Sequence, residues 1–281
     1  MRVLATGAGR AIPGPAGAQP PRSPSWFTRN RARVLPIATT VAILLLWQIV
    51  GMTVHLNPLF FSYPSKIWGG FLDLARGPLL LDLRVSGSEF VLGMVMSVAI
   101  ALPVGLLMGT VQNVYYAFDP IVSALYSTPV LVLAPLLVLY FGLGIASKVA
   151  IVVILSTFPI MINLTEGVRN TDRALLRAAR LFGASRWRLY RDVIFPSAVP
   201  FFVTGLRLAI GRALIGVIVG EYIASTAGVG YQINADTEVF ATPRYLAGIA
   251  IVLFFAVVIT ELLKALERRL APWGHANREH E

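Results

Sequence analysis

The 281-residue chain contains no cysteine and only three lysines. Without cysteine, disulfide bonds, cysteine-ligated zinc and iron–sulfur clusters are excluded. A P-loop needs a lysine in the context G-x4-G-K-[S/T], and none of the three has it, so this mode of ATP binding is also excluded. The three histidines stand apart, and no nucleophilic triad or dinucleotide fingerprint occurs. We therefore expect no catalytic, cofactor-binding or metal-binding residues.

Charged residues are also scarce. They make up 14% of the chain, whereas hydrophobic residues make up 56%; soluble domains usually carry about 25% charge. No charged residue occurs between Asp119 and Lys148. The composition therefore indicates a chain solvated mainly by lipid. The net charge of +10 would favour nucleic acid on a soluble protein. Here the arginines stand between apolar runs, which fits topology signals and contact with anionic headgroups, so we expect no nucleic-acid binding.

Six apolar runs predict six transmembrane helices in an all-α membrane protein. They cover about residues 34–53, 90–111, 121–143, 149–165, 199–224 and 245–260. Glycine, alanine and serine recur every fourth residue in the second run, from Gly93 to Gly109, and small residues recur again from Gly216 to Ala224. Such stripes allow helix backbones to approach closely, either between two copies of the chain or inside one subunit.

Basic residues alternate between the two sides of these runs. They concentrate before the first run, after the sixth, and between the fourth and fifth, where they are Arg169, Arg173, Arg177, Arg180, Arg186, Arg188 and Arg191. The other connections hold fewer: Lys66, Arg76, Arg84, Lys148 and Arg244. Because cytoplasmic loops carry the excess of Lys and Arg, both termini and the arginine-rich loop should be cytoplasmic.

The chain divides into a transmembrane domain, 34–268, between two cytoplasmic tails, 1–33 and 269–281. The first tail is rich in proline and glycine and predicts disorder, and it lacks the apolar core of a secretory signal. Between the first two spans, Pro64 precedes a short amphipathic helix over 65–75. This helix should lie on the membrane surface or cover the bundle.

The arginine-rich loop, about 169–198, predicts two helices joined at a glycine. Thr171 or Asp172 can cap the first, in which Leu175 and Phe182 belong to one apolar face. Gly183 is suited to a left-handed turn after it. Ser185 can cap the second helix, which Pro196 should end or kink, with Pro200 starting the next span. Such an elbow fits a groove on a partner protein, and it equally fits an interfacial hairpin held by anionic lipid.

Within this loop, Arg177-Ala178-Ala179-x3-Gly183-x9-Val193-Ile194-Phe195-Pro196 resembles the EAA motif of ABC-transporter permeases, E-A-A-x3-G-x9-I-x-L-P. Arg177 replaces Glu, Val193 replaces Ile and Phe195 replaces Leu, whereas the other motif positions match. The resemblance implies that the ATPase-coupling residues are Arg177, Ala178, Ala179, Gly183, Val193, Phe195 and Pro196.

Further matches extend the resemblance over about residues 60–262, to permeases of the nitrate/sulfonate/taurine type. They are Pro129–Leu136 followed by Tyr140–Gly144, then Gly205–Arg212, Glu221-Tyr222 and Gly228–Tyr231. The resemblance implies a type I ABC importer permease in a bacterial inner membrane. It also implies a second permease copy, two cytoplasmic ATPase subunits and an extracytoplasmic binding protein that delivers an organic sulfonate, taurine, nitrate or similar anion. The chain itself would be a transport subunit and not an enzyme.

Pathway or gating residues are predicted among helix-interrupting prolines and intramembrane charges. Pro129 and Pro135 interrupt the third span and can either hinge a pathway or serve static packing. Among the charges, Arg212 and Glu221 are the candidates. Arg212 can attract an anion, or it can form a structural ion pair with Glu221 or Glu261.

Two other functions are compatible with a multi-span chain. An ion-gradient-driven anion transporter would need acidic or polar coupling groups at midmembrane, often in repeated broken helices, and no repeat is apparent. A membrane-embedded enzyme would need clustered His, Asp or Glu at one depth, which the sequence lacks. Neighbouring genes for an ATPase and a binding protein would distinguish the importer from the transporter.

Overall fold

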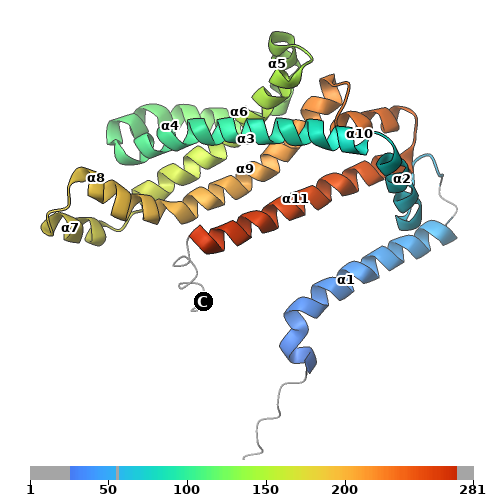
Figure 1. The fold of residues 1–281 in the computed structure, drawn as a ribbon, viewed down its shortest axis with the longest axis horizontal. Coiled ribbons are helices and arrows are strands. Elements are labelled where there is room, and N and C mark those ends of the chain that lie inside the picture. Colours follow the sequence, from blue (N-terminus) through green and yellow to red (C-terminus); the bar gives the residue numbers. More distant parts are fainter. Residues whose placement is uncertain (1–25, 55–56, 271–281) are drawn as a thin grey trace, which may run out of the picture. The chain divides into compact units, whose positions relative to one another are not determined.

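The computed structural model describes residues 26–54 and 57–270, and all regular secondary structure within those ranges is helical (Figure 1). The helices are α1 (Trp26–Thr53), α2 (Pro64–Arg76), α3 (Leu79–Thr110), α4 (Gln112–Ser127), α5 (Ala134–Phe141), α6 (Ile145–Arg169), α7 (Arg173–Leu181), α8 (Arg186–Leu189), α9 (Phe195–Ala224), α10 (Val229–Glu238) and α11 (Thr242–Leu270). A 3-10 turn, η1 (Val130–Leu133), precedes α5, and a π-helical turn, η2 (Tyr190–Ile194), joins α8 to α9.

Helix α1, as far as Val50, belongs to a compact unit separate from the remainder of the chain. Its segment Val34–Thr53 is long and apolar enough to cross a membrane, as predicted for the first span. The helix begins at Trp26, inside the segment 1–33 that we expected to be a tail. The prolines on which that expectation rested lie outside the described residues, as does most of the second tail, 269–281.

Five described helices are long and apolar enough to span a membrane, and the number is six if one bent pair of helices counts as a single span. The pair is α4 with η1 and α5, bent by 77° at the place predicted for the third span. Pro129 causes the break, because a proline disfavours helical geometry in the preceding residue, and Thr128 is extended, with φ −71° and ψ 135°. Pro135 has a different position from the one predicted. It lies in the first turn of α5, where a missing N–H costs nothing, so it begins a helix and does not interrupt one.

Helices α3, α6 and α9 pack together as the centre of the bundle, with α11 beside α9 (Figure 1). The small-residue stripe of α3 faces α6: a Cβ at Gly93 would overlap Val152, and one at Gly105 would lie 3.1 Å from Leu164 Cδ2. Gly216 and Gly220 of α9 also face α6. Both stripes therefore serve packing within one chain, which was one of the two predicted alternatives.

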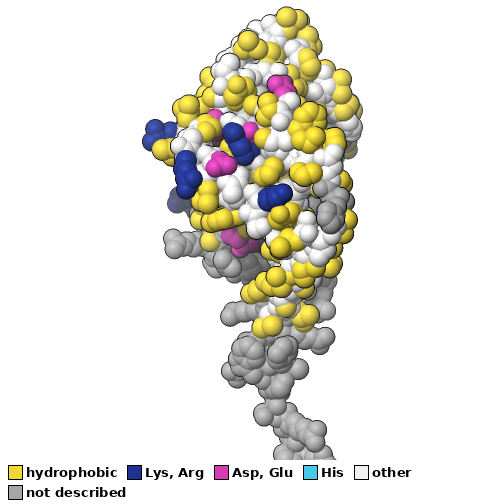
Figure 2. Space-filling model, turned by 90° about the vertical axis from the view of Figure 1, so that its right-hand side faces the viewer, with side chains coloured by type: hydrophobic (Ala, Val, Ile, Leu, Met, Phe, Trp, Pro, Cys, Tyr) yellow, Lys and Arg dark blue, Asp and Glu magenta, His cyan; other side chains and the backbone are white. Residues whose placement is uncertain are grey.

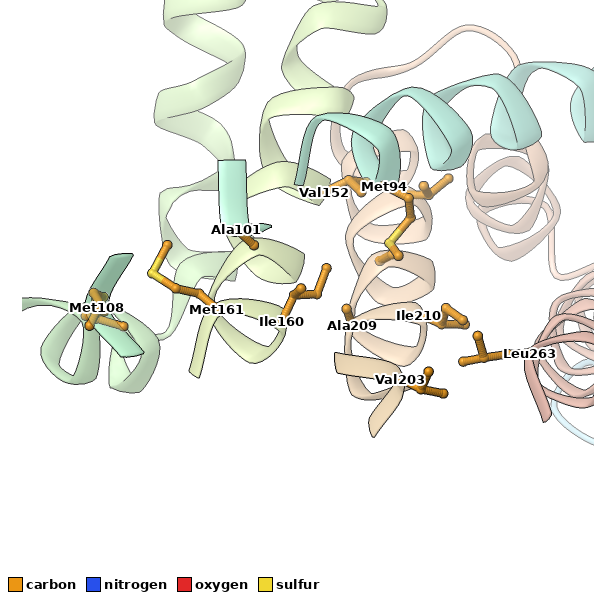
Figure 3. Close-up of a cluster of buried hydrophobic side chains, with 13 residues drawn as sticks. Met94, Ala101, Met108, Val152, Ile160, Met161, Val203, Ala209, Ile210 and Leu263 are labelled. Carbon is orange, nitrogen blue, oxygen red and sulfur yellow. The ribbon is translucent and has the colours of Figure 1, made fainter. Parts of the chain in front are cut away.

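The largest hydrophobic core fills the space between these helices (Figure 3). Met94 and Ala101 of α3 meet Val152 and Ile160 of α6, and Ala209 lies on the facing side of α9. Helix α2 packs through Leu74 on Ala247 and Ile251 of α11, so this amphipathic helix covers the bundle.

Large apolar side chains are also exposed on the outside of the bundle. Leu253 and Phe254 of α11 are 64% and 62% exposed. In Figure 2 hydrophobic side chains cover much of the visible face, interrupted by a small group of charged residues. A surface of this kind is stable in lipid and unstable in water.

The bundle has two distinct ends. Helices α7 and α8 lie at one, which we call the elbow end, and α2 and α10 lie at the other, which we call the far end (Figure 1). Helix α6, with 25 residues, runs between them over about 37 Å, enough to cross the hydrocarbon core. The sequence pattern did not predict α10.

Candidate functional site

The elbow, residues 172–194, begins with a capped amphipathic helix. The Asp172 carboxylate accepts a hydrogen bond from the Ala174 N–H (2.6 Å) and caps α7, one of the two residues predicted for this role. At the other end, Gly183 has φ +75°, the Ala184 N–H donates to the Ala179 carbonyl (3.0 Å), and the Gly183 N–H donates to the Arg180 carbonyl (3.0 Å). These two bonds form a Schellman motif, which confirms the left-handed turn predicted at Gly183.

The second half of the elbow differs from prediction. Ser185 caps α8 by accepting a hydrogen bond from the Arg188 N–H (3.4 Å), as expected. The chain then widens into η2, where the Phe195 N–H bonds to the Tyr190 carbonyl. Pro196 has no backbone N–H to donate, and the π turn just before it accommodates the missing hydrogen bond. Pro196 therefore neither ends nor breaks the helix. It lies in the first turn of α9, and Pro200 lies within that helix, so the predicted start of the fifth span at Pro200 was wrong.

The motif residues lie in two places, on the first helix of the elbow and at its junction with α9. Arg177, Ala178 and Ala179 lie on α7 before the turn, whereas Val193, Phe195 and Pro196 lie where the elbow joins α9. Between them is a tip whose apolar side chains are almost fully in solvent: Leu181 is 88% exposed, Phe182 92% and Trp187 72%. An exposed apolar tip on a tightly closed turn is a surface for contact with another protein or with lipid.

Arg212 lies on α9 against the broken span. Its guanidinium donates to the Tyr126 hydroxyl (3.0 Å) and lies 4.5 Å from the centre of that ring. Among the described residues no ion pair joins Arg212 to Glu221 or Glu261, the partners named for the structural alternative. Glu261 accepts from Lys264 (2.6 Å), and Glu221 is engaged at the far end. Arg212 is therefore held by an aromatic neighbour one turn before the break at Pro129.

Glu221 organises the far end of the bundle. It is fully buried and accepts hydrogen bonds from the Ser86 hydroxyl (2.6 Å) and the Gly230 N–H (2.7 Å). Asp82 accepts from the Gly228 N–H (2.9 Å), and Ser86 accepts from the Val229 N–H (2.9 Å). Side chains of α3 and α9 thus bind the first N–H groups of α10, as helix caps do. Gly228 has φ +118°, and a Cβ there would overlap the Glu221 carboxylate.

Lys148 is buried in the same region and was missed as a candidate. Its ammonium donates to the carbonyls of Leu143, Gly144 (3.2 Å) and Ala224. Glu89, 2% exposed, is an electrostatic neighbour of both Lys148 and Glu221. Its Oε2 has no hydrogen-bond partner among the described residues. The available signal was that Lys148 is the one lysine next to a long uncharged run.

An acidic residue of α10 itself is paired with an arginine. Asp236 is 2% exposed, and its carboxylate oxygen Oδ1 lies 3.2 Å from the guanidinium nitrogen Nη2 of Arg244 on α11. Burial raises the pKa of Asp236, while hydrogen bonding by Gln232 and the charge of Arg244 oppose the rise. Across the part of the chain that the structure describes, no three His, Asp or Glu residues are grouped as a metal site would require.

Residues 101–272 match the family model for the binding-protein-dependent transport system inner membrane component. The chain belongs to this family. The match covers α6, the elbow, α9 and α11, so it includes the whole scaffold that carries the elbow. The chain is thus an inner-membrane permease subunit of the ABC-importer class and not an enzyme, as the resemblance implied.

Individual relatives agree. The taurine transport system permease protein TauC of Escherichia coli (strain K12) is 32% identical over 250 residues, 87% of this chain and 91% of the relative. The formylaminopyrimidine transport permease protein ThiX of Halalkalibacterium halodurans is 31% identical over 87% of this chain and 98% of its own length. A solved structure titled as inward-facing conformations of the MetNI methionine ABC transporter matches with a TM-score of 0.56. It is 18% identical and covers 69% of this chain and 94% of that chain. This likeness confirms the predicted fold class.

Proposed function

We propose that this permease imports a small organic or inorganic anion, such as a sulfonate, taurine or nitrate, delivered by an extracytoplasmic binding protein. The motion would come from ATP hydrolysis on two separate cytoplasmic subunits, and two copies of this chain would enclose the pathway. The observation that carries the proposal is the elbow, where the EAA-like spacing coincides with a Schellman-closed turn and an exposed apolar tip.

The coupling step would use the elbow as a rigid lever. Gly183 sets the turn between α7 and α8, and Phe182 and Trp187 are both exposed on either side of it. The π turn then connects α8 to α9 without a flexible joint. When the ATPase subunits close, a force on the tip would pass along α9, toward Arg212 and finally Glu221. Arg177, Ala178 and Ala179 form the ATPase side of this lever, and Val193, Phe195 and Pro196 form its root.

Orientation follows from the same assignment. The elbow and both termini would be cytoplasmic, with the tails 1–33 and 269–281 flanking the transmembrane domain 34–268. The far end, with α2 and α10, would then face the binding protein. The arginine excess of the elbow and the small number of basic residues at the far end support this arrangement.

The pathway would pass the break in the third span. Arg212 supplies a cation there that has no carboxylate partner in the described structure, and Pro129 creates the bend beside it. A positive group without a counter-ion attracts an anion. The name of TauC supports a sulfonate, whereas that of ThiX points to a neutral pyrimidine.

Proteoliposomes containing this chain, its ATPase and its binding protein provide the test. We expect uptake of taurine, an alkyl sulfonate or nitrate that requires both ATP and the binding protein. Uptake driven by an ion gradient without ATP would overturn the importer mechanism. Uptake of formylaminopyrimidine alone would be consistent with the ATP-driven mechanism but would contradict the proposal that the substrate is an anion.

A further inference from the structure

We propose that a cavity at the base of the elbow binds a phosphate group, carried by an anionic phospholipid headgroup or present as free phosphate. The site is separate from the exposed tip and from the Arg212 region. It would join the elbow to the ends of the membrane helices through a bound anion.

The cavity has a volume of about 460 Å³ and lies between three parts of the chain. Gly109, Thr110 and Gln112, where α3 turns into α4, form one wall. Val168 and the end of α6 form the second, and the inner face of α7, α8 and η2 forms the third. It is therefore a partly open cavity where the elbow meets the bundle.

Four arginines line this space: Arg169, Arg173, Arg180 and Arg186. They come from the end of α6, both ends of α7 and the start of α8, so the fold of the elbow brings them to one cavity. No acidic residue lines it. Among the described ion pairs none involves any of the four.

The nearest carboxylates do not line the cavity. Asp172 caps α7, Asp192 lies 3.9 Å from Arg191, and Asp119 and Glu166 act on Tyr115, the ring that Arg169 contacts. The lining itself therefore carries positive charge and no negative charge. Such a cavity attracts an external anion.

One arginine is already held in position. The Arg169 guanidinium lies 3.7 Å from the centre of the Tyr115 ring and donates to the Gln112 amide oxygen (3.4 Å). This contact orders one fork of donors before a ligand arrives. Planar guanidinium groups bind phosphate oxygens in pairs, so several converging arginines favour phosphate over a monovalent halide.

The location favours a ligand at the membrane surface. Arg169 ends α6, a membrane-spanning helix, so the cavity lies at the level where the apolar span stops. Phospholipid headgroups occupy this level, and free phosphate can reach it from solvent. A bound headgroup would stabilise the elbow against its own positive charge.

The test compares two double variants of the full chain that lose the same charge. Arg173→Gln with Arg180→Gln removes two cavity arginines. Arg188→Gln with Arg191→Gln removes two elbow arginines that do not line the cavity. Each protein is purified in neutral detergent and checked for monodispersity. Native mass spectrometry then measures binding of phosphatidylglycerol and phosphatidylcholine, and calorimetry measures inorganic phosphate.

We expect phosphatidylglycerol to bind the natural protein and phosphatidylcholine to bind it much less. The cavity variant should weaken this affinity by at least about tenfold, because two charge-assisted hydrogen bonds are lost, while the control stays near the natural value. Calorimetric binding of phosphate that competes with the lipid would identify free phosphate as a ligand, and its absence would identify the headgroup. Equal loss in both variants, or loss in neither, would overturn the site.

Discussion

The ammonium of Lys148, near the start of α6, donates a hydrogen bond to the carbonyl of Ala224, the last residue of α9. The same group also binds the carbonyls of Leu143 and Gly144. One buried cation thus binds both the carboxyl-terminal end of α9 and the loop that precedes α6. The carboxylates of Glu89 and Glu221 are its electrostatic neighbours. This contact fixes the far end of the bundle, at the opposite end of α6 from the elbow.

Replacing Lys148 should therefore destabilise the protein strongly. Lys148→Met keeps the volume but leaves three carbonyls without their charged donor. Leaving a buried acceptor unsatisfied costs about 1–3 kcal/mol. We expect a large fall in the melting temperature of the detergent-solubilised chain. Lys66→Met, on the exposed part of α2, is the control and should melt like the natural protein.

Gly228 should not tolerate a side chain. Its φ of +118° disfavours L-residues, and a Cβ would overlap the Glu221 carboxylate that holds Gly230. We expect Gly228→Ala to cost about 1–3 kcal/mol and to increase hydrogen exchange in α10. Gly87→Ala is the matched control, because nothing lies within 4 Å of a Cβ there and the helix favours alanine. Unchanged exchange in α10 of the Gly228 variant would contradict this account of the far end.

Much of this structure could be predicted from local sequence. The spacing of Leu175 and Phe182 and the glycine at 183 specify a helix and its left-handed end within one short segment. Pro196 misled the prediction because a proline is equally suited to the first turn of a helix, and the π turn that decides between these outcomes has no clear local signature. Contacts across the fold were also inaccessible: Ala224 lies 76 residues from Lys148 in the chain, and Tyr126 lies 86 residues from Arg212. Nor did composition reveal that the hydrogen-bond and ring partner of Arg212 would be a neutral residue, Tyr126.

The orientation of the elbow can be tested directly because the chain has no cysteine. We expect Phe182→Cys, at the exposed tip, to resist a membrane-impermeant thiol reagent in intact cells and to react in opened vesicles. Lys66→Cys and Gly144→Cys, at the far end, should react in intact cells. External labelling of the cysteine at position 182 would reverse the proposed topology.

A substitution at Gly183 tests whether the elbow acts as a rigid lever, and it does so without disturbing the packing of other residues. No atom lies within 4 Å of a Cβ at this position, so Gly183→Val acts only through its φ of +75°. Left-handed geometry costs about 1–2 kcal/mol for such a residue. We expect the variant to insert normally but to lose substrate-stimulated ATPase activity. Gly183→Asn, which tolerates the left-handed region, should retain most of it. Full activity of the valine variant would indicate that the elbow serves only as a lipid anchor.

A substitution of Arg212 distinguishes a role of this residue in transport from a role in assembly of the complex. Since its described partners are the hydroxyl and ring of Tyr126, Arg212→Gln leaves no buried carboxylate unpaired. We therefore expect the complex with the ATPase to assemble at the natural yield, whereas uptake of the anion falls at least about tenfold because the pathway loses its cation. Tyr126→Phe removes the hydroxyl and keeps the ring, so it should reduce uptake less. Both variants are measured for detergent-stable assembly and for uptake in the same preparation. Dissociation of the Arg212→Gln complex would show that the arginine is structural, and normal uptake by that complex would show that it does not meet the substrate.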